Sequence, residues 1–261
     1  MKLLFDPEIN GKPMRVACFM SGTGTNTRKL IEYQKNLENA YQNHPFEVAL
    51  IFTDNPNSNA RAIAEEVGIQ YVESDFEKFF EDKDKNDWEP RKMFDRMTYW
   101  LLKKYDIQTI ALCGYARIVT EPLLGNYLTI NVHPGDLSVA EHGKRKYVGL
   151  HHMPAKKAIL NGEQFLHSTT HIVTEDLDAG PILIISKGLK IELPDGITID
   201  GLRNNNELLD DVAKEHQSRL KEIGDWQILP LTLHWVAEGR FAADENNNIY
   251  LDGNRIGGYR L

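Results

Sequence analysis

Apolar and polar residues alternate along the chain in blocks that predict strands separated by helices. Continuous apolar runs are typical of strands buried on both faces of a parallel sheet, whereas apolar residues every three to four positions predict helices. The predicted strands are 14–20, 46–54, 69–74, 107–114, 128–133, 168–175 and 182–193, and the predicted helices are 27–42, 57–68, 91–106, 153–163, 205–222 and 227–238, with a helical turn at 120–127. This order predicts an α/β fold, a Rossmann-like and mostly parallel sheet flanked by helices.

The same pattern predicts a single domain over residues 1–261, because no repeat, low-complexity linker or change of composition divides the chain. Three parts lie outside the regular alternation. Residues 1–13 are expected to form an N-terminal extension that ends in Gly11-Lys12-Pro13, residues 136–149 a long polar loop, and residues 239–253 a C-terminal hairpin.

Composition narrows the possible functions. The net charge of −8 disfavours non-specific nucleic-acid binding, which needs a basic surface. Neither a signal peptide nor a membrane span is recognisable, so a cytoplasmic protein without a membrane partner is expected. Cys18 and Cys113 lie in apolar runs, where small buried side chains are favoured over reactive thiols, and two cysteines in 261 residues agree with a reducing compartment.

A glycine-rich loop, Ser21-Gly22-Thr23-Gly24-Thr25-Asn26, follows the first strand of the predicted sheet. Ligands of parallel α/β folds bind at this edge, and a helix N-terminus attracts a phosphate. Thr27 replaces the third glycine of a dinucleotide fingerprint, and the Gly-Lys-Ser/Thr of a triphosphate loop is missing. A phosphate monoester is therefore favoured over the alternative that the glycines only make a tight turn.

Polar residues gather where the later strands end. Asn131 and His133 lie on one side of the strand 128–133, and Asp178 precedes the strand 182–193. An amide and a protonated imidazole stabilise a developing oxyanion, and a carboxylate keeps the imidazole charged or relays a proton. Because no Gly-x-Ser-x-Gly elbow is present, we expect direct attack of a substrate nucleophile on a carbonyl, without a covalent enzyme intermediate.

Histidine is frequent in the second half of the chain, at His142, His151, His152, His167 and His171. No His-Glu-x-x-His motif and no neighbouring cysteine accompanies them, so a metal site is disfavoured, although the spacing of His167 and His171 leaves it open. His171 is expected to line the site or to support His133.

These motifs resemble those of a known family. The segments "SGTGTN", "LCGYARIV", "INVHP", "THIVTEDLDAGPIL" and "LHWVAEGRFAADENNNIYLDG" are similar to the folate-dependent formyltransferases, and among them to the glycinamide ribonucleotide formyltransferases of purine synthesis. The resemblance implies transfer of a formyl group from 10-formyltetrahydrofolate to a primary amine. It also implies small-molecule substrates, no required metal, and a monomer or homodimer.

The resemblance assigns roles to individual residues. It places the catalytic trio on Asn131, His133 and Asp178, and the substrate phosphate on Gly24, Thr25 and Asn26. His171 and Asp225 are possible supporting residues, Asp225 standing where the family has a glutamate. The residues implied to contact the folate are Arg91, Ala116, Arg117, Ile118, Val119, Thr174, Glu175, Asp176 and Leu177.

The loop 136–149 departs from the family pattern. It begins Gly-Asp-Leu-Ser where the family has Ser-Leu-Leu-Pro, and it is several residues longer. Lys144, Arg145 and Lys146 are candidates to meet the substrate phosphate or the glutamate tail of the folate, and a solvated surface loop is the alternative.

Other functions stay open. One alternative is a folate-dependent formyltransferase that acts on a different phosphorylated amine, or a formyltetrahydrofolate hydrolase. Another alternative, of a different class, is a non-catalytic folate- or nucleotide-binding protein. A dinucleotide oxidoreductase is a third, which Thr27 disfavours.

Overall fold

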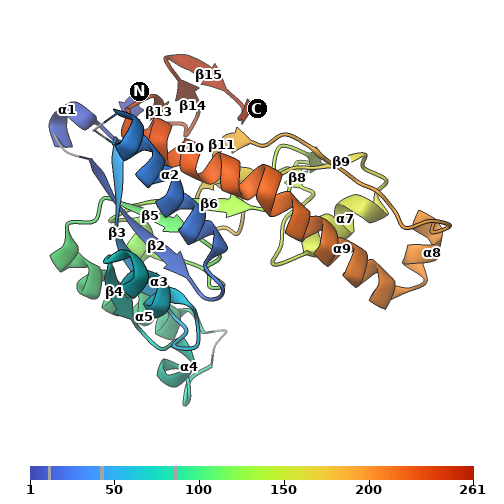
Figure 1. Ribbon diagram of the computed structural model, residues 1–261, viewed down its shortest axis with the longest axis horizontal. Coiled ribbons are helices and arrows are strands. Elements are labelled where there is room, and N and C mark those ends of the chain that lie inside the picture. The colour runs from blue at the N-terminus through green and yellow to red at the C-terminus, as the bar shows by residue number, and fades with distance from the viewer. Residues whose placement is uncertain (11–12, 42–43, 85–86) are drawn as a thin grey trace.

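The computed structural model describes residues 1–10, 13–41, 44–84 and 87–261, and its centre is an eight-stranded sheet (Figure 1). The strand order is β16-β11-β10-β6-β5-β2-β3-β4. The central strands are parallel, whereas β10 runs antiparallel to both β6 and β11. The mostly parallel sheet predicted from the sequence is therefore confirmed. Its strands are β2 (Met14–Met20), β3 (Phe46–Thr53), β4 (Gln70–Glu73), β5 (Thr109–Leu112), β6 (Leu128–His133), β10 (Thr169–Ile172), β11 (Ile182–Ile185) and β16 (Tyr259–Arg260).

Helices cover both faces of this sheet because successive side chains of a buried strand point to opposite sides. On β2, Val16 and Cys18 pack into one core, and Ala17 and Phe19 into another. The first core is closed by α2 (Thr25–Tyr41), α3 (Ala60–Val67) and α10 (Trp226–Ala237), and the second by α4 (Phe76–Phe79), α5 (Trp88–Leu102) and α6 (Glu121–Leu124), with a 3₁₀ turn at Lys103–Tyr105.

A third core lies beyond the sheet, at the right in Figure 1. It is built from α7 (Met153–Leu160), α8 (Ile199–Arg203), α9 (Asn206–Leu220), β9 (Phe165–Leu166) and β12 (Leu189–Lys190). The helices predicted at 205–222 and 227–238 are joined, since a π-helical turn over Lys221–Asp225 connects α9 to α10. Such turns are frequent at functional sites.

The N-terminal strand and three strands of the segment 241–256 share a small antiparallel sheet. It has the order β1-β13-β14-β15, with β1 (Lys2–Leu3), β13 (Phe241–Ala243), β14 (Ile249–Leu251) and β15 (Asn254–Ile256). The predicted C-terminal hairpin is confirmed. The expected N-terminal extension packs onto the fold, because β1 pairs with β13 and Phe5 is buried. Helix α1 (Pro7–Asn10) follows, and Gly11 and Lys12 lie outside the described residues.

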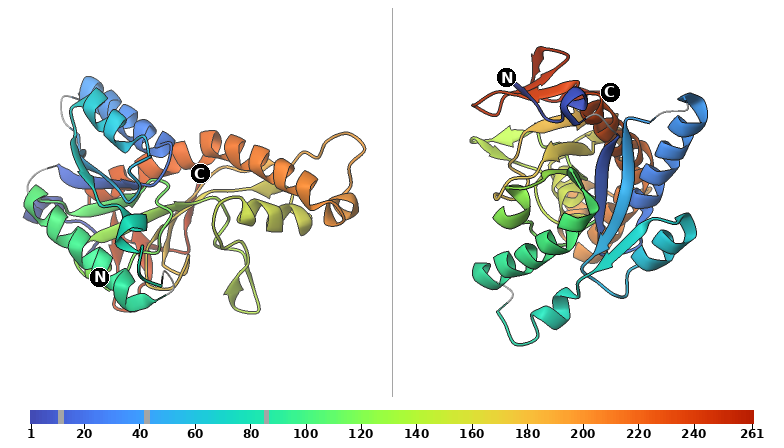
Figure 2. Two further views of the ribbon diagram at one scale, coloured as in Figure 1. Left: turned by 90° about the horizontal axis from the view of Figure 1, so that it is seen from below. Right: turned by 90° about the vertical axis from the view of Figure 1, so that its left-hand side faces the viewer.

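The long loop 136–149 forms a hairpin of its own, which projects from the body of the molecule (Figure 2, left). Strands β7 (Ala140–Glu141) and β8 (Lys144–Arg145) are joined by His142 and Gly143, which both have positive φ, as a tight two-residue hairpin turn requires. The predicted strand 182–193 is split at Gly188 into β11 and β12. No described helix is long and apolar enough to cross a membrane.

Candidate active site

A cleft of about 440 Å³ lies at the carboxyl ends of β2, β5 and β6, the edge at which ligands of parallel sheets bind. We call it the central cleft. It brings together most of the residues singled out in the sequence. Its walls are residues 21–26, 112–119, 131–134, 149–151, 171, 173–174 and 177–178, with Gln217, Lys221 and Asp225 from the junction of α9 and α10.

His133 is buried in the wall of this cleft, and its hydrogen bonds fix the position of its protons. Nε2 lies 2.7 Å from the backbone carbonyl of Tyr147, and a carbonyl only accepts hydrogen bonds, so Nε2 carries a proton. Nδ1 lies 3.5 Å from Oδ1 of Asp178. The imidazole therefore presents Nδ1 to the cleft and to the carboxylate.

Asn131 is held by a second histidine. Its Nδ2 lies 3.2 Å from Nε2 of His171, whose Nδ1 lies 3.0 Å from the Ile172 carbonyl. Since that carbonyl takes the proton of Nδ1, Nε2 is the acceptor for the amide. Burial lowers the pKa of His171 to about 4, which keeps this arrangement neutral. His171, which was expected to line the site or to support His133, lines the cleft and orients Asn131.

Asp178 lies in a strained turn before β11. Its φ is 54°, a left-handed conformation that non-glycine residues adopt at a cost. The backbone N–H of Gly149 donates to Oδ2 of Asp178 at 3.1 Å, and Arg145 donates to its carbonyl. Side chain and backbone are both fixed, so the carboxylate stays beside His133.

The glycine-rich loop opens α2 at one end of the cleft. Gly24 has φ 73°, and a Cβ there would lie 2.5 Å from Ile63 Cδ1, so this position admits only glycine without rearrangement. Asn26 is buried, and its Oδ1 has no hydrogen-bond partner among the described residues. The 17-residue helix directs its free N–H groups and dipole into the cleft, as a phosphate site requires.

Asp225 lies next to this loop, in the π-helical turn. It accepts a hydrogen bond from Ser168 Oγ at 2.6 Å, and Asn26 Nδ2 lies 3.4 Å from its other oxygen. Complete burial raises the pKa of the Asp225 carboxyl. Asp225, which was expected only as a possible supporting residue, therefore lines the cleft beside the glycine-rich loop.

The loop 115–119 forms another part of the wall, next to the glycine-rich loop, and a buried carboxylate holds it. Asp54 accepts from Arg117 Nε at 2.7 Å and from Ser21 Oγ at 2.5 Å, and Ser21 in turn accepts from the backbone N–H of Ala116 at 2.9 Å. The two cleft loops are thus tied together. Asp54 was not predicted as a site residue, because it belongs to no motif, and Ser21 was singled out only as the first residue of the glycine-rich loop.

Several predicted folate contacts lie away from the lining. Arg91 is buried behind it, where it donates twice to the Ile118 carbonyl and pairs with Asp95 at 2.9 Å. Glu175 and Asp176 are exposed outside the lining, whereas Ala116, Arg117, Ile118, Val119, Thr174 and Leu177 belong to it.

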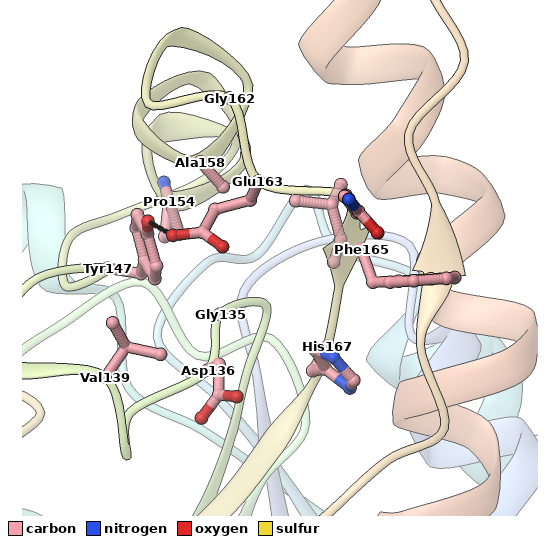
Figure 3. Close-up of a pocket in the computed structure, with 12 residues that line it drawn as sticks. Gly135, Asp136, Val139, Tyr147, Pro154, Ala158, Gly162, Glu163, Phe165 and His167 are labelled. Atoms are coloured by element: carbon pink, nitrogen blue, oxygen red, sulfur yellow. Dashed lines mark hydrogen bonds between the residues drawn. The ribbon is translucent and has the colours of Figure 1, made fainter.

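A second pocket, shown in Figure 3, is lined by Gly135, Tyr147 and other residues of the segments 135–147 and 154–167. His167 lines it together with Asp136 and Glu163, while His171 lines the central cleft, so the structure separates the two histidines that sequence spacing placed on one face. Within the described ranges, no group of three or more His, Cys, Asp or Glu side chains is placed to hold a metal ion.

The sequence was compared with known families and structures. Residues 14–196, more than half of the chain, match the formyl transferase family model. The chain belongs to the formyl transferase family. The matched segment carries both cleft loops and the Asn131, His133 and Asp178 side chains.

Individual relatives are similar over different shares of their length. The phosphoribosylglycinamide formyltransferase of Escherichia coli is 25% identical over 93% of this chain and 96% of its own. The structure of the Coxiella burnetii phosphoribosylglycinamide formyltransferase has a TM-score of 0.68 at 24% identity, over 96% of this chain and all of that one, which shows the shared fold. The formyltetrahydrofolate deformylase of Bacillus subtilis is 27% identical over 57% of this chain and 41% of its own.

Proposed function

We propose that the protein transfers the formyl group of 10-formyltetrahydrofolate to the amine of glycinamide ribonucleotide, a step of purine synthesis. The observation that carries this proposal is the central cleft itself. The proposed anion cradle, residues 24–26, and the partly apolar loops 115–119 and 173–178 all contribute to its lining. Asn131, His133 and Asp178 line the same cleft, where a phosphorylated amine and a formyl-folate would meet.

The proposed reaction begins with attack of the amine nitrogen on the formyl carbon. The new C–N bond leaves negative charge on the formyl oxygen, which the second N–H of Asn131 and a protonated Nδ1 of His133 stabilise. Asp178 beside His133 accepts the proton that the amine loses and passes it to the folate nitrogen as its bond to carbon breaks. No bond between enzyme and formyl group is needed.

The donor site is proposed along the loops 115–119 and 173–178. Ile118 and Leu177 are exposed apolar side chains that line the cleft, and a flat pterin ring buries such surface favourably. Backbone groups of the two loops would recognise the ring edges. Arg91 contributes indirectly, by holding the carbonyl of Ile118.

The acceptor site is proposed at the glycine-rich loop. The phosphate would bind the free N–H groups at the start of α2, and Lys221, which lines the same end of the cleft, would add positive charge. The buried Asp225 would accept from the amine or ribose of the acceptor.

We propose further that residues 1–261 form one domain, because β1 completes the sheet formed by the C-terminal strands.

A panel of amines tests the proposal. With 10-formyltetrahydrofolate as donor, turnover is measured for glycinamide ribonucleotide, for its dephosphorylated nucleoside and for other phosphorylated amines. We expect product only with phosphorylated acceptors, and the highest kcat/KM with glycinamide ribonucleotide. Equal rates for the dephosphorylated nucleoside would contradict the assignment of the cradle, and a higher kcat/KM with another phosphorylated amine would change the acceptor.

Hydrolysis of the formyl-folate is the second candidate function, favoured by the similarity to the formyltetrahydrofolate deformylase of Bacillus subtilis. In that case water would replace the amine. Formate release at the same rate with and without any amine would favour this function.

A further inference from the structure

The base of the hairpin 136–149, and not its charged tip, contacts the catalytic residues. Arg145 is half-buried and uses both ends of its guanidinium on the turn that carries Asp178. Nη1 donates to the carbonyl of Asp178, and Nη2 donates to the carbonyl of Gly180 at 2.8 Å. Lys144, its neighbour in β8, is exposed and lies outside the lining of the central cleft.

The turn held by Arg145 has little freedom to adjust. Asp178 has positive φ, and a Cβ on Gly180 would lie 1.8 Å from the carbonyl oxygen of Ile172 in β10. Its backbone therefore packs directly against the sheet. Backbone carbonyl groups that are packed against a sheet need hydrogen-bond donors, and the planar guanidinium of an arginine can donate to two of them at once.

Two residues further along, Tyr147 reaches the other catalytic group. Its carbonyl accepts from His133 Nε2 at 2.7 Å, and its hydroxyl donates to Glu163 (Figure 3). Lys157 Nζ donates to the next carbonyl, that of Val148, at 2.7 Å. The backbone of this short segment is thus anchored on both sides of the point where it contacts the imidazole.

We propose that residues 145–149 are the positioning segment of the active site, with Arg145 and Tyr147 setting the placement of His133 relative to Asp178. Neither residue is catalytic, because Arg145 contacts only the backbone of the turn, and Tyr147 acts through its carbonyl. The kinetic part of this inference rests on the proposed function. The structural part concerns the imidazole alone and is independent of the acceptor.

The physical consequence is a single state of the imidazole. While the Tyr147 carbonyl holds a proton on Nε2, Nδ1 faces the cleft and Asp178, and the second proton that the proposed reaction needs is taken up there. When the segment loosens, the ring exchanges between tautomers and rotates, and the fraction of protein ready to react falls. Because the proposed acceptor contacts lie at residues 24–26, away from this turn, kcat falls and the KM of the acceptor does not.

The test compares Arg145→Met with Lys144→Met, which removes the same charge one residue away. Losing hydrogen bonds from a charged donor costs about 1.5–3 kcal/mol, so we expect kcat to fall by about 10-fold to 100-fold in Arg145→Met. We expect the KM of the acceptor within twofold of wild type, and a wild-type kcat in Lys144→Met. Arg145→Lys, which keeps the charge and reaches one carbonyl, should recover part of kcat. Equal kcat for the two methionine variants would overturn the proposal.

A second readout uses ¹⁵N NMR of His133 in the protein without substrates, with melting temperatures to confirm folding. Wild type and Lys144→Met should show a single Nε2–H form, and Arg145→Met and Arg145→Lys an exchange between tautomers. An unchanged single form in both Arg145 variants would overturn the inference. If wild type transfers no formyl group but shows the NMR difference, the proposed function fails and the positioning segment stands.

Discussion

Asn131 and His171 lie directly opposite each other on the antiparallel strands β6 and β10, with Nδ2 of the amide 3.2 Å from Nε2 of the imidazole. The register of the two strands creates this pair, because residues 131 and 171 are Cα partners. A neutral His171 accepts from the amide, whereas a protonated one would direct a second donor at it. The orientation of Asn131 therefore depends on the charge of His171.

Stability should fall as the pH is lowered from about 6.5 to 4. Burial lowers the folded-state pKa of His171 to about 4, below the usual histidine value of about 6.5, so in this range the unfolded chain binds a proton that the folded one does not. Asp178, His133 and Arg145 also face this ring. We expect a loss of about 3 kcal/mol from His171 over this range, measured by urea unfolding. His171→Gln should lose less over the same range, whereas His142→Asn, on the exposed hairpin tip, should follow wild type.

A pair of glycine variants tests the phosphate cradle. In Gly24→Ala the new methyl group would lie 2.5–2.9 Å from atoms of Ile63 and Met20, and the alanine backbone would have to keep a positive φ. Together these effects should destabilise the protein by about 1–3 kcal/mol. Displacement of the loop should also raise KM for the acceptor. Gly22→Ala, with no atom within 4 Å of its new Cβ, is the control. Equal acceptor KM values in the two variants would argue against binding at this loop.

The carboxylate behind loop 115–119 should affect the donor more than the acceptor. Asp54→Asn removes the charge that pairs with Arg117 at 2.7 Å and weakens the bond from Ser21. We expect KM for the formyl-folate to rise by about 10-fold, since a charge-assisted hydrogen bond is worth about 1.5–3 kcal/mol, and KM for the acceptor to rise less. Glu77→Gln alters the exposed partner of the same arginine and should change neither value more than about twofold.

Removing the imidazole should separate chemistry from binding. His133→Ala is expected to lower kcat by about 100-fold to 10,000-fold, the range typical of a lost general acid or oxyanion donor. Dissociation constants of both substrates, measured by calorimetry, should stay within about threefold of wild type because the phosphate and pterin contacts remain. A kcat near that of wild type would remove His133 from the mechanism.

The sequence predicted those parts of the site that depend on local pattern. Apolar runs identified the buried strands, and parallel strands bring their carboxyl ends to one edge, which placed Asn131 and His133 correctly. The N-terminal segment was misjudged because β1 is only two residues long and pairs with a strand about 240 positions away. Such pairing leaves no periodicity to read.

The remaining contacts of the site had no signal in the sequence. The Tyr147 carbonyl that accepts from His133 is a backbone group, which any residue type would supply. Arg145 stood out as part of a basic run, and its contacts with the carbonyls of Asp178 and Gly180 depend on the way the hairpin folds back. The charges of this loop were expected to meet a substrate, and the contacts of Arg145 are with the protein's own backbone.

The most direct test follows the formyl carbon itself. Wild-type protein is given 10-formyltetrahydrofolate labelled with ¹³C in the formyl group, together with glycinamide ribonucleotide, and the label is followed by NMR. We predict that the label appears as a formamide on the acceptor, in step with the release of tetrahydrofolate, and that His133→Ala slows both by the same factor. Label recovered as formate, or a folate that keeps its label, would contradict formyl transfer by this site.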